Sequence, residues 1–271
     1  MTGFSADWLT LREPADERAR APEIRAAVIS ALSNAQAPLV VDFACGTGST
    51  VRALCSLLPA GQRWQLVDHD AALLTRARAE CTGLGGIAEL ETIKVDLAAG
   101  PFPLLDRVDL VTTSAFLDLL SEDWLVGLID ALAERRLPFY AALTYDGRVT
   151  CSPQHALDDE VTDLVNRHQH GEKGFGPALG PNAAAHAIER LEKAGFKVVQ
   201  ARSDWTCRED EPIFQRELVE GWANAAAEIG GLSAEDLQAW TRFRLEEIDA
   251  GRSQIQVGHI DIFALPTDVP N

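Results

Sequence analysis

A two-glycine turn near the N-terminus is the stretch of the sequence most suited to ligand binding. Residues 41–50 read Val-Asp-Phe-Ala-Cys-Gly-Thr-Gly-Ser-Thr, so Asp42 ends an apolar run and Gly46 and Gly48 follow it. Glycines in such a turn let the backbone approach a ligand closely, and the helix that follows offers free N–H groups to an anion. A dinucleotide-binding loop carries a third glycine where this sequence has Val51, so a nicotinamide cofactor is disfavoured.

Two more carboxylates are expected at the ends of the next strands. Asp68 ends the second apolar run and Asp96 the third. In a doubly wound sheet ligands bind outside the carboxyl ends of the strands, where Asp68 could accept hydrogen bonds from ribose hydroxyls and Asp96 from an adenine amino group. Each acid taken alone could instead cap the turn or helix after it. The three carboxylates together favour a ligand with a cationic sulfonium and an amine over a pyrophosphate.

Positioning these residues requires a mostly parallel sheet with helices between its strands. Short runs rich in Val, Leu and Ile alternate with helical patterns along the chain, which is typical of βαβ units. We therefore expect a doubly wound α/β fold. Strands are expected at residues 38–43, 63–68, 88–95, 108–113, 139–145, 196–201 and 255–265. Helices are expected at residues 15–34, 49–58, 71–81 and 156–170, from about 121 onward, and up to 195.

The stretch of residues 207–253 lies between the last two expected strands and is too long for a hairpin loop. Phe214, Leu218 and Trp222 recur in it at helical spacing, and Ser233 with Asp236 resembles a capping box. The pattern predicts two amphipathic helices inserted as a cap, whose aromatic residues we interpret as core rather than as a ligand cage.

Three segments resemble the motifs of class I S-adenosylmethionine (SAM)-dependent methyltransferases. Residues 42–48 are similar to the first motif, 67–70 to the second and 95–97 to the third, and the likeness extends over residues 38–145. It implies a Rossmann-like sheet of seven strands with the last antiparallel, and SAM as the cofactor. It also implies a single domain over residues 1–271, with residues 1–36 as an N-terminal helical lid. By the same resemblance the cofactor-binding residues are Asp42, Ala44, Gly46, Gly48, Asp68, His69, Asp96, Leu97, Ser114 and Ala115.

The sequence indicates less about the residues that bind the methyl acceptor than about those that bind the cofactor. A sulfonium methyl is already activated, so holding donor and acceptor in line can supply about 7–11 kcal/mol, and a base is needed only when the acceptor must lose a proton. The candidate catalytic residues are His168 in a glycine-rich segment and Tyr145 and Asp146 just past the fifth expected strand; a surface loop and a plain turn are the alternatives. Candidate substrate-binding residues are Arg12, Asp16, His170, Lys173 and Trp205, although Arg12 and Asp16 could form a surface ion pair and Trp205 could be core.

Composition narrows the class of acceptor. The net charge of −17 repels phosphate backbones, and Thr113-Ser-Ala-Phe116 stands where amino-group methyltransferases of nucleic acids carry a PPY-type tetrapeptide. Five cysteines without a CxxC pair predict neither disulfides nor a metal site, and no apolar run reaches the roughly 20 residues of a membrane span. The N-terminus does not resemble a signal peptide. We expect a cytoplasmic enzyme that methylates a small molecule; a macromolecular methyltransferase and a non-catalytic SAM-binding protein are the alternatives, and the oligomeric state is left open.

Overall fold

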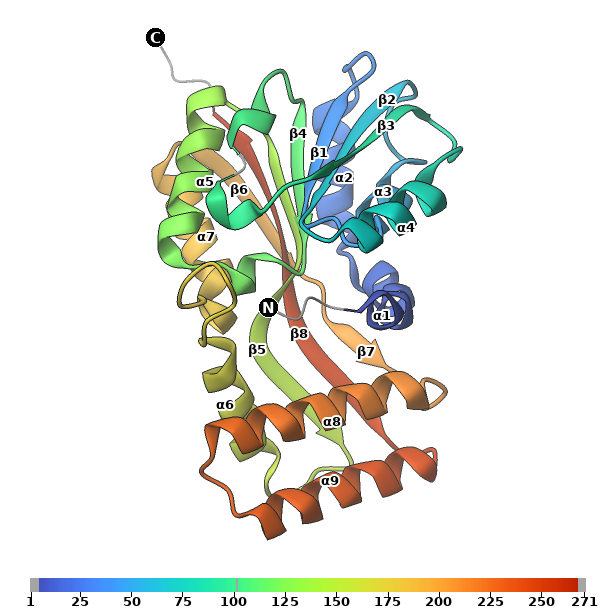
Figure 1. Ribbon diagram of the computed structural model, residues 1–271, viewed down its shortest axis with the longest axis vertical. Coiled ribbons are helices and arrows are strands. Elements are labelled where there is room, and N and C mark those ends of the chain that lie inside the picture. Colours follow the sequence, from blue (N-terminus) through green and yellow to red (C-terminus); the bar gives the residue numbers. More distant parts are fainter. Residues whose placement is uncertain (1–4, 101, 268–271) are drawn as a thin grey trace.

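One twisted sheet runs through the molecule. Because β1 lies inside the sheet, the turn at residues 44–48, which follows β1, lies in the middle of the row of carboxyl strand ends. The computed structural model describes residues 5–100 and 102–267. Among them eight strands pair in the order β3-β2-β1-β4-β5-β8-β6, with β7 also paired to β8 (Figure 1). β1 to β5 run parallel, and β8 is antiparallel to its neighbours. The strands are β1 Leu39–Phe43, β2 Gln62–Asp68, β3 Ile87–Lys94, β4 Leu110–Ser114, β5 Phe139–Ser152, β6 Phe196–Arg202, β7 Trp205–Cys207 and β8 Gln254–Pro266.

Helices cover both faces of the sheet, as the alternating pattern predicts. α2, α3 and α4 bury Val28, Leu54 and Leu74 in one apolar cluster, while α5 and α7 bury Leu128 and Leu191 in another. This doubly wound arrangement exposes the carboxyl ends of the parallel strands between the two layers. The helices are α1 Ala6–Ala19, α2 Pro22–Leu32, α3 Ser49–Leu54, α4 Ala71–Cys81, α5 Glu122–Arg135, α6 Asp158–Gln169, α7 Ala183–Lys193, α8 Pro212–Ile229 and α9 Ala234–Asp249.

The expected helical insertion is present as α8 and α9. Ser233 caps α9 and accepts a hydrogen bond from the Asp236 backbone N–H at 3.0 Å, which confirms the predicted helix start. β5 and β8 extend past the carboxyl ends of β1 and β4. The two inserted helices lie at the far end of this extension, below the main sheet (Figure 1). α8 packs against α6, so a second layer forms beside the carboxyl edge. None of the described helices is long and apolar enough to cross a membrane.

The single N-terminal helix expected at residues 15–34 is wrong, because the chain forms two helices there. Ala21, which precedes Pro22, is extended at φ −64° and ψ 120°, since a residue before proline avoids the helical region. Pro14 lies inside α1 rather than before it. Residues 8–16 are therefore helical, and they lie beside the carboxyl edge of the sheet. Residues 1–4 of the expected lid lie outside the described residues.

The fifth strand is longer than expected, and the sheet has eight strands rather than seven. β5 continues through Asp146, so the turn expected after Tyr145 is a bulge inside the strand. There Tyr145 pairs with His259 and Val149 with Val257, which leaves extra residues on β5 around Gly147, at φ +86°. The additional strand is β7, which pairs with β8 and ends at Cys207, the first residue of the stretch assigned to the cap.

Candidate functional site

Three neighbouring strands have a residue with a strained backbone, just past the ends of β1 and β4 and inside β5. Ala44 after β1, Ala115 after β4 and Leu143 in β5 have φ of 51°, 48° and 54°. Residues with a Cβ rarely adopt this left-handed conformation, and such strain concentrates at functional sites. Leu143 is held in it by a hydrogen bond from its N–H to a carboxylate oxygen of Asp261, at 2.8 Å. The three bends lie where β1, β4 and β5 run side by side.

The two glycines form a tight cradle. Gly46 and Gly48 have φ of +54° and +85°. A Cβ on Gly48 would lie 2.6 Å from the Cys81 Sγ, and one on Gly46 would lie 3.0 Å from Leu9 Cδ1. Only glycine therefore fits this backbone without displacing a neighbour. The N–H of Gly46 donates to Asp68 Oδ2 at 3.0 Å, so the Asp68 carboxylate ties the turn to the end of β2.

Asp42 is a buried carboxylate below this turn. Its Oδ1 accepts a hydrogen bond from Thr112 Oγ1 at 2.7 Å, and its Oδ2 has no partner among the described residues. Burial raises the pKa of Asp42 to about 7, although the Thr112 hydrogen bond and the charge of Arg20 act in the opposite direction. The guanidinium of Arg20 also donates to Ser114 Oγ at 3.2 Å. A cationic amine placed above the turn would stabilise the ionised form of Asp42.

The remaining cofactor candidates lie along the same edge. The Val95 N–H donates to the Asp68 carbonyl at 3.0 Å, which brings the ends of β2 and β3 together. The exposed His69 ring lies 3.2 Å from the Asp68 carboxylate. Asp96 Oδ1 accepts the Ala98 N–H at 3.0 Å, so this acid does cap the following turn. The sequence-predicted residues are thus brought together, while their contacts with a ligand stay a prediction.

Helix α1 covers the cradle. A cavity of about 30 Å³, room for only a few water molecules, separates Leu9 and Arg12 from the glycine turn. Glu13 forms a two-point ion pair with Arg52 of α3, at 2.5 and 2.6 Å. Arg12 and Asp16 are 3.2 Å apart, and this pair is buried rather than exposed.

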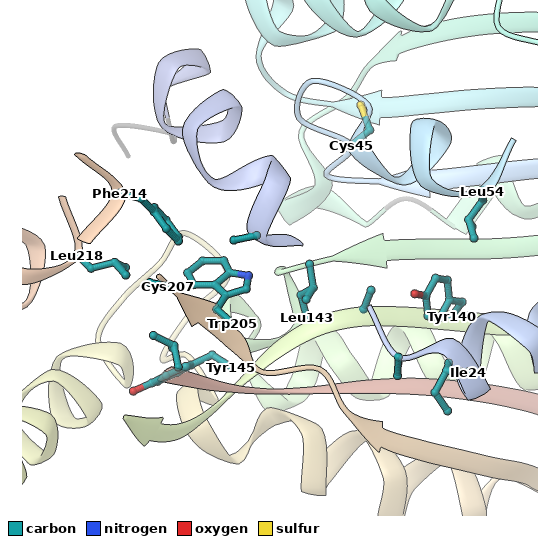
Figure 2. Close-up of a cluster of buried hydrophobic side chains, with 14 of the residues drawn as sticks. Ile24, Cys45, Leu54, Tyr140, Leu143, Tyr145, Trp205, Cys207, Phe214 and Leu218 are labelled. Carbon is teal, nitrogen blue, oxygen red and sulfur yellow. The ribbon is translucent and has the colours of Figure 1, made fainter. Parts of the chain in front are cut away.

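A second cavity, of about 520 Å³, lies between the carboxyl edge of the sheet and α8. Figure 2 shows Trp205 and Tyr145 on the sheet side of an apolar cluster, with Phe214 and Leu218 of α8 opposite them. Ala115 and Arg12 line this cavity too, and Arg12 also lines the smaller one. The two compartments therefore adjoin at α1 and at the end of β4. We call the larger one the acceptor cavity.

Several sequence-predicted acceptor residues line the acceptor cavity. They are Arg12, Tyr145, His168, Lys173 and Trp205. The Tyr145 hydroxyl donates to Asn166 Oδ1 at 2.8 Å, and burial raises its pKa. His168 Nε2 lies 3.0 Å from a Glu228 carboxylate oxygen.

Three other candidates do not line the acceptor cavity. The bulge in β5 brings Asp146 against Arg148, whose Nε donates to it at 2.7 Å, and Arg148 also donates to Asp204. These three side chains form an ion-pair network. His170 lies with its Nδ1 3.2 Å from the Ala178 carbonyl oxygen. Asp16 instead lines the smaller cavity and accepts a hydrogen bond from Trp205 Nε1 at 2.8 Å.

Among the residues of the acceptor cavity that sequence reasoning missed, Asp118 and His259 are buried and titratable. The Nδ1 of His259 lies 3.0 Å from the Val257 carbonyl oxygen, which can only accept. Nδ1 therefore carries the proton and Nε2 is an acceptor. Burial, together with the charge of Arg12, lowers the pKa of His259 to about 3, so the ring is neutral. For Asp118 the available signal was an acid inside the apolar run of residues 116–120, next to the end of β4.

Comparison with known proteins agrees with this arrangement. Residues 40–136 match the family described as "Methyltransferase domain". No curated protein matches the chain. The structure of BH2331 from Bacillus halodurans C-125 is similar, with a TM-score of 0.52, 15% identity and coverage of 89% of this chain and 98% of that one. The YcgJ protein from Bacillus subtilis gives 0.52, 14%, 92% and 100%. At these identities the structural likeness shows the fold.

The matched residues contain the glycine turn and the ends of β1 to β4, and this region is a methyltransferase domain. Its strand-end acids and two-glycine turn lie where a SAM-binding site is expected from the sequence. The residues present fit that cofactor. A Cβ at Gly46 or Gly48 would crowd Leu9 or Cys81, so glycine keeps the backbone of this turn open to a ligand, and the buried carboxylate of Asp42 below it would attract the positive end of SAM. Bound there, SAM supplies an activated methyl group on a cationic sulfur.

Proposed function

We propose that the protein transfers the methyl group of SAM to a small molecule bound in the acceptor cavity. The observation that carries the proposal is the position of this cavity, which adjoins the cofactor cradle at Ala115 and Arg12. Its volume of about 520 Å³ lies within the range of small-molecule sites.

The walls of the cavity suit an enclosed acceptor. They come from α1, β5, β8, α6 and α8, so the acceptor is surrounded by elements from both ends of the chain. Their surface is mainly apolar, with Trp8, Trp205 and Trp222 among the contributors. A wall of this kind excludes water and aligns a bound molecule with a donor at the sheet edge. The role we propose for the chain's own residues is therefore mainly orientation, with cofactor contacts from the strand-end acids.

The test is to fill the cavity from the α8 side. Ala225 lines it, whereas Ala227 is exposed on the same helix. We expect Ala225→Phe to reduce labelled methyl transfer from SAM to a small-molecule extract at least about tenfold, because the ring occupies acceptor space. Ala227→Phe is the matched control and should retain wild-type transfer. Both variants should bind S-adenosylhomocysteine like the wild type, as measured by calorimetry.

Three outcomes contradict the proposal. One is equal transfer by the Ala225→Phe and Ala227→Phe variants, which places the acceptor elsewhere. A second is transfer to protein or RNA fractions and not to small molecules, which favours a macromolecular methyltransferase. A third is cofactor binding without transfer to any fraction, as expected of a non-catalytic SAM-binding protein.

A further inference from the structure

One oxygen of a buried carboxylate in the acceptor cavity lacks a hydrogen-bond donor among the described residues. Asp118 is 8% exposed, and its Oδ1 has no hydrogen-bond partner among the described residues. It lies in the short 3-10 helix Leu117–Leu119, three residues beyond the strained Ala115, and both residues line the cavity. A buried acceptor without a donor is costly in free energy. Asp118 is therefore placed to accept a hydrogen bond from a molecule bound beside the end of β4.

Two cationic side chains act on Asp118 in the acceptor cavity. Burial raises the pKa of Asp118 to about 6, while its own backbone N–H and the charges of Arg12 and Lys173 act in the opposite direction. Both cations also line the cavity, where they offset the carboxylates of Asp118 and Glu217. A hydroxyl oxygen that gains negative charge as it loses its proton would be stabilised by the same two cations.

The walls favour a planar acceptor. Four aromatic side chains, Trp8, Tyr145, Trp205 and Trp222, line the cavity. Aromatic side chains pack well against flat rings, in stacked or edge-to-face arrangements. On the basis of the proposed function, we propose that the acceptor is a phenol, whose hydroxyl is held by Asp118 and methylated on oxygen.

The proposed step balances within the site. The phenol oxygen forms a bond to the methyl carbon, the bond from that carbon to sulfur breaks, and its electron pair stays on sulfur. The phenol proton passes to the carboxylate of Asp118, which later releases it to solvent. Arg12 and Lys173 stabilise the negative charge on the oxygen before the bond forms. His259, held neutral with Nε2 as an acceptor, adds no positive charge to the cavity.

Three probes with one skeleton separate the possible nucleophiles. 4-Phenylphenol, 4-phenylaniline and biphenyl-4-thiol differ only in the atom that receives the methyl group. Each is incubated with labelled SAM and the wild type, Asp118→Asn or Asp130→Asn; Asp130 is exposed on α5 and serves as the matched control. We expect O-methylation of 4-phenylphenol by the wild type and the control. The Asp118→Asn rate should be at least about 100-fold lower, as is usual for loss of a general base.

Two further readouts distinguish a role in proton transfer from a structural role. In the wild type, kcat/KM for 4-phenylphenol should rise with pH through about 6, since only the ionised Asp118 carboxylate accepts the proton. The Asp118→Asn profile should lack this limb, while S-adenosylhomocysteine affinity and Tm stay at or above wild-type values. The other titratable groups that line the cavity are Arg12 on α1, Tyr145 on β5, His168 on α6, Lys173 in the loop after α6, Glu217 on α8 and His259 on β8.

The inference is overturned if the amine or the thiol is methylated and the phenol is not. It is also overturned if none of the three probes is methylated by protein that binds S-adenosylhomocysteine, or if Asp118→Asn retains the wild-type rate and pH profile. The proposed function survives these outcomes as long as label still reaches a small molecule of the extract. It fails separately when no small molecule is labelled.

Discussion

The cofactor cradle and the acceptor cavity are built in different ways. The cradle comes from residues 42–115, and its groups stand at the ends of strands that follow one another along the chain. The acceptor cavity takes its walls from α1 to β8, and groups such as Arg12 and His259 are almost the whole chain apart. The cradle is thus encoded locally, while the cavity depends on how distant elements pack. A change in the cradle should therefore be severe, and most changes in the cavity should be graded.

The largest effect is expected at Gly48. Gly48→Ala would place a Cβ 2.6 Å from the Cys81 Sγ, so the turn must shift. We expect S-adenosylhomocysteine affinity to fall about 100-fold, a displacement cost of ~3 kcal/mol. Gly83→Ala is the control, because Gly83 has a similar φ of +84° but nothing within 4 Å of the new Cβ. Equal affinities of the two variants in calorimetry would contradict the expectation that crowding at Gly48 weakens cofactor binding.

A smaller loss is expected at Asp68. Asp68→Ala removes the proposed ribose contacts and the hydrogen bond from Gly46, and charge-assisted bonds contribute about 1.5–3 kcal/mol. Cofactor affinity should therefore fall roughly 10- to 100-fold. Asp70→Ala removes the N-cap of α4 and should lower stability by about 1 kcal/mol with little effect on affinity. If Asp68→Ala changes stability alone, Asp68 only fixes the turn.

In the acceptor cavity, removing a charge should stabilise the fold. The pKa of Asp118 in the folded state, about 6, lies above its usual value of 3.8, so the folded state binds the proton more tightly than the unfolded chain. Stability therefore falls as pH rises from about 4 to 6 and stays lower above that range. Asp118→Asn should be more stable than the wild type by up to about 3 kcal/mol at pH 8, with no gain at pH 4. Urea unfolding at the two pH values measures this, and a loss of stability at pH 8 contradicts it.

The smallest effect is expected at Lys173. Its charge lowers the pKa of Asp118, so Lys173→Met should raise that pKa. The acid limb of kcat/KM for 4-phenylphenol should move to higher pH by a fraction of a unit. Lys197→Met, exposed on β6, should leave the profile in place. A limb that stays fixed in both variants means that Lys173 does not act on the group that titrates.

The contrast between the two regions also explains what the sequence predicted. Asp42, Gly48, Asp68 and Asp96 could be placed because each follows an apolar run, and parallel strands end at one edge. Asp146 was expected just past the end of the fifth strand, because an Asp-Gly pair is typical of a turn, whereas pairing with β8 keeps it inside a bulged strand. Such long-range pairing leaves no local signal.

His259 could not be recognised for a related reason. On an alternating strand such as β8 a histidine has no pattern that separates a cavity wall from the core. Its burial depends on α1 and β5, which are remote in sequence. Asp118 lay in an apolar run and was overlooked because its missing hydrogen-bond partner is visible only in three dimensions.

Helix α1 has a thermodynamic consequence. The Glu13–Arg52 ion pair holds it against α3, and the Asp16–Trp205 hydrogen bond holds it against β7. Its residue Arg12 lines both the small cavity over the glycine turn and the acceptor cavity. The space between Leu9 and the glycine turn is only about 30 Å³, so we expect a cofactor that binds against this turn to displace the helix. A displaced common wall also reshapes the neighbouring compartment. Binding of the cofactor and binding of the acceptor are then thermodynamically linked. If the cofactor changes the affinity for the acceptor by some factor, the acceptor changes the affinity for the cofactor by the same factor.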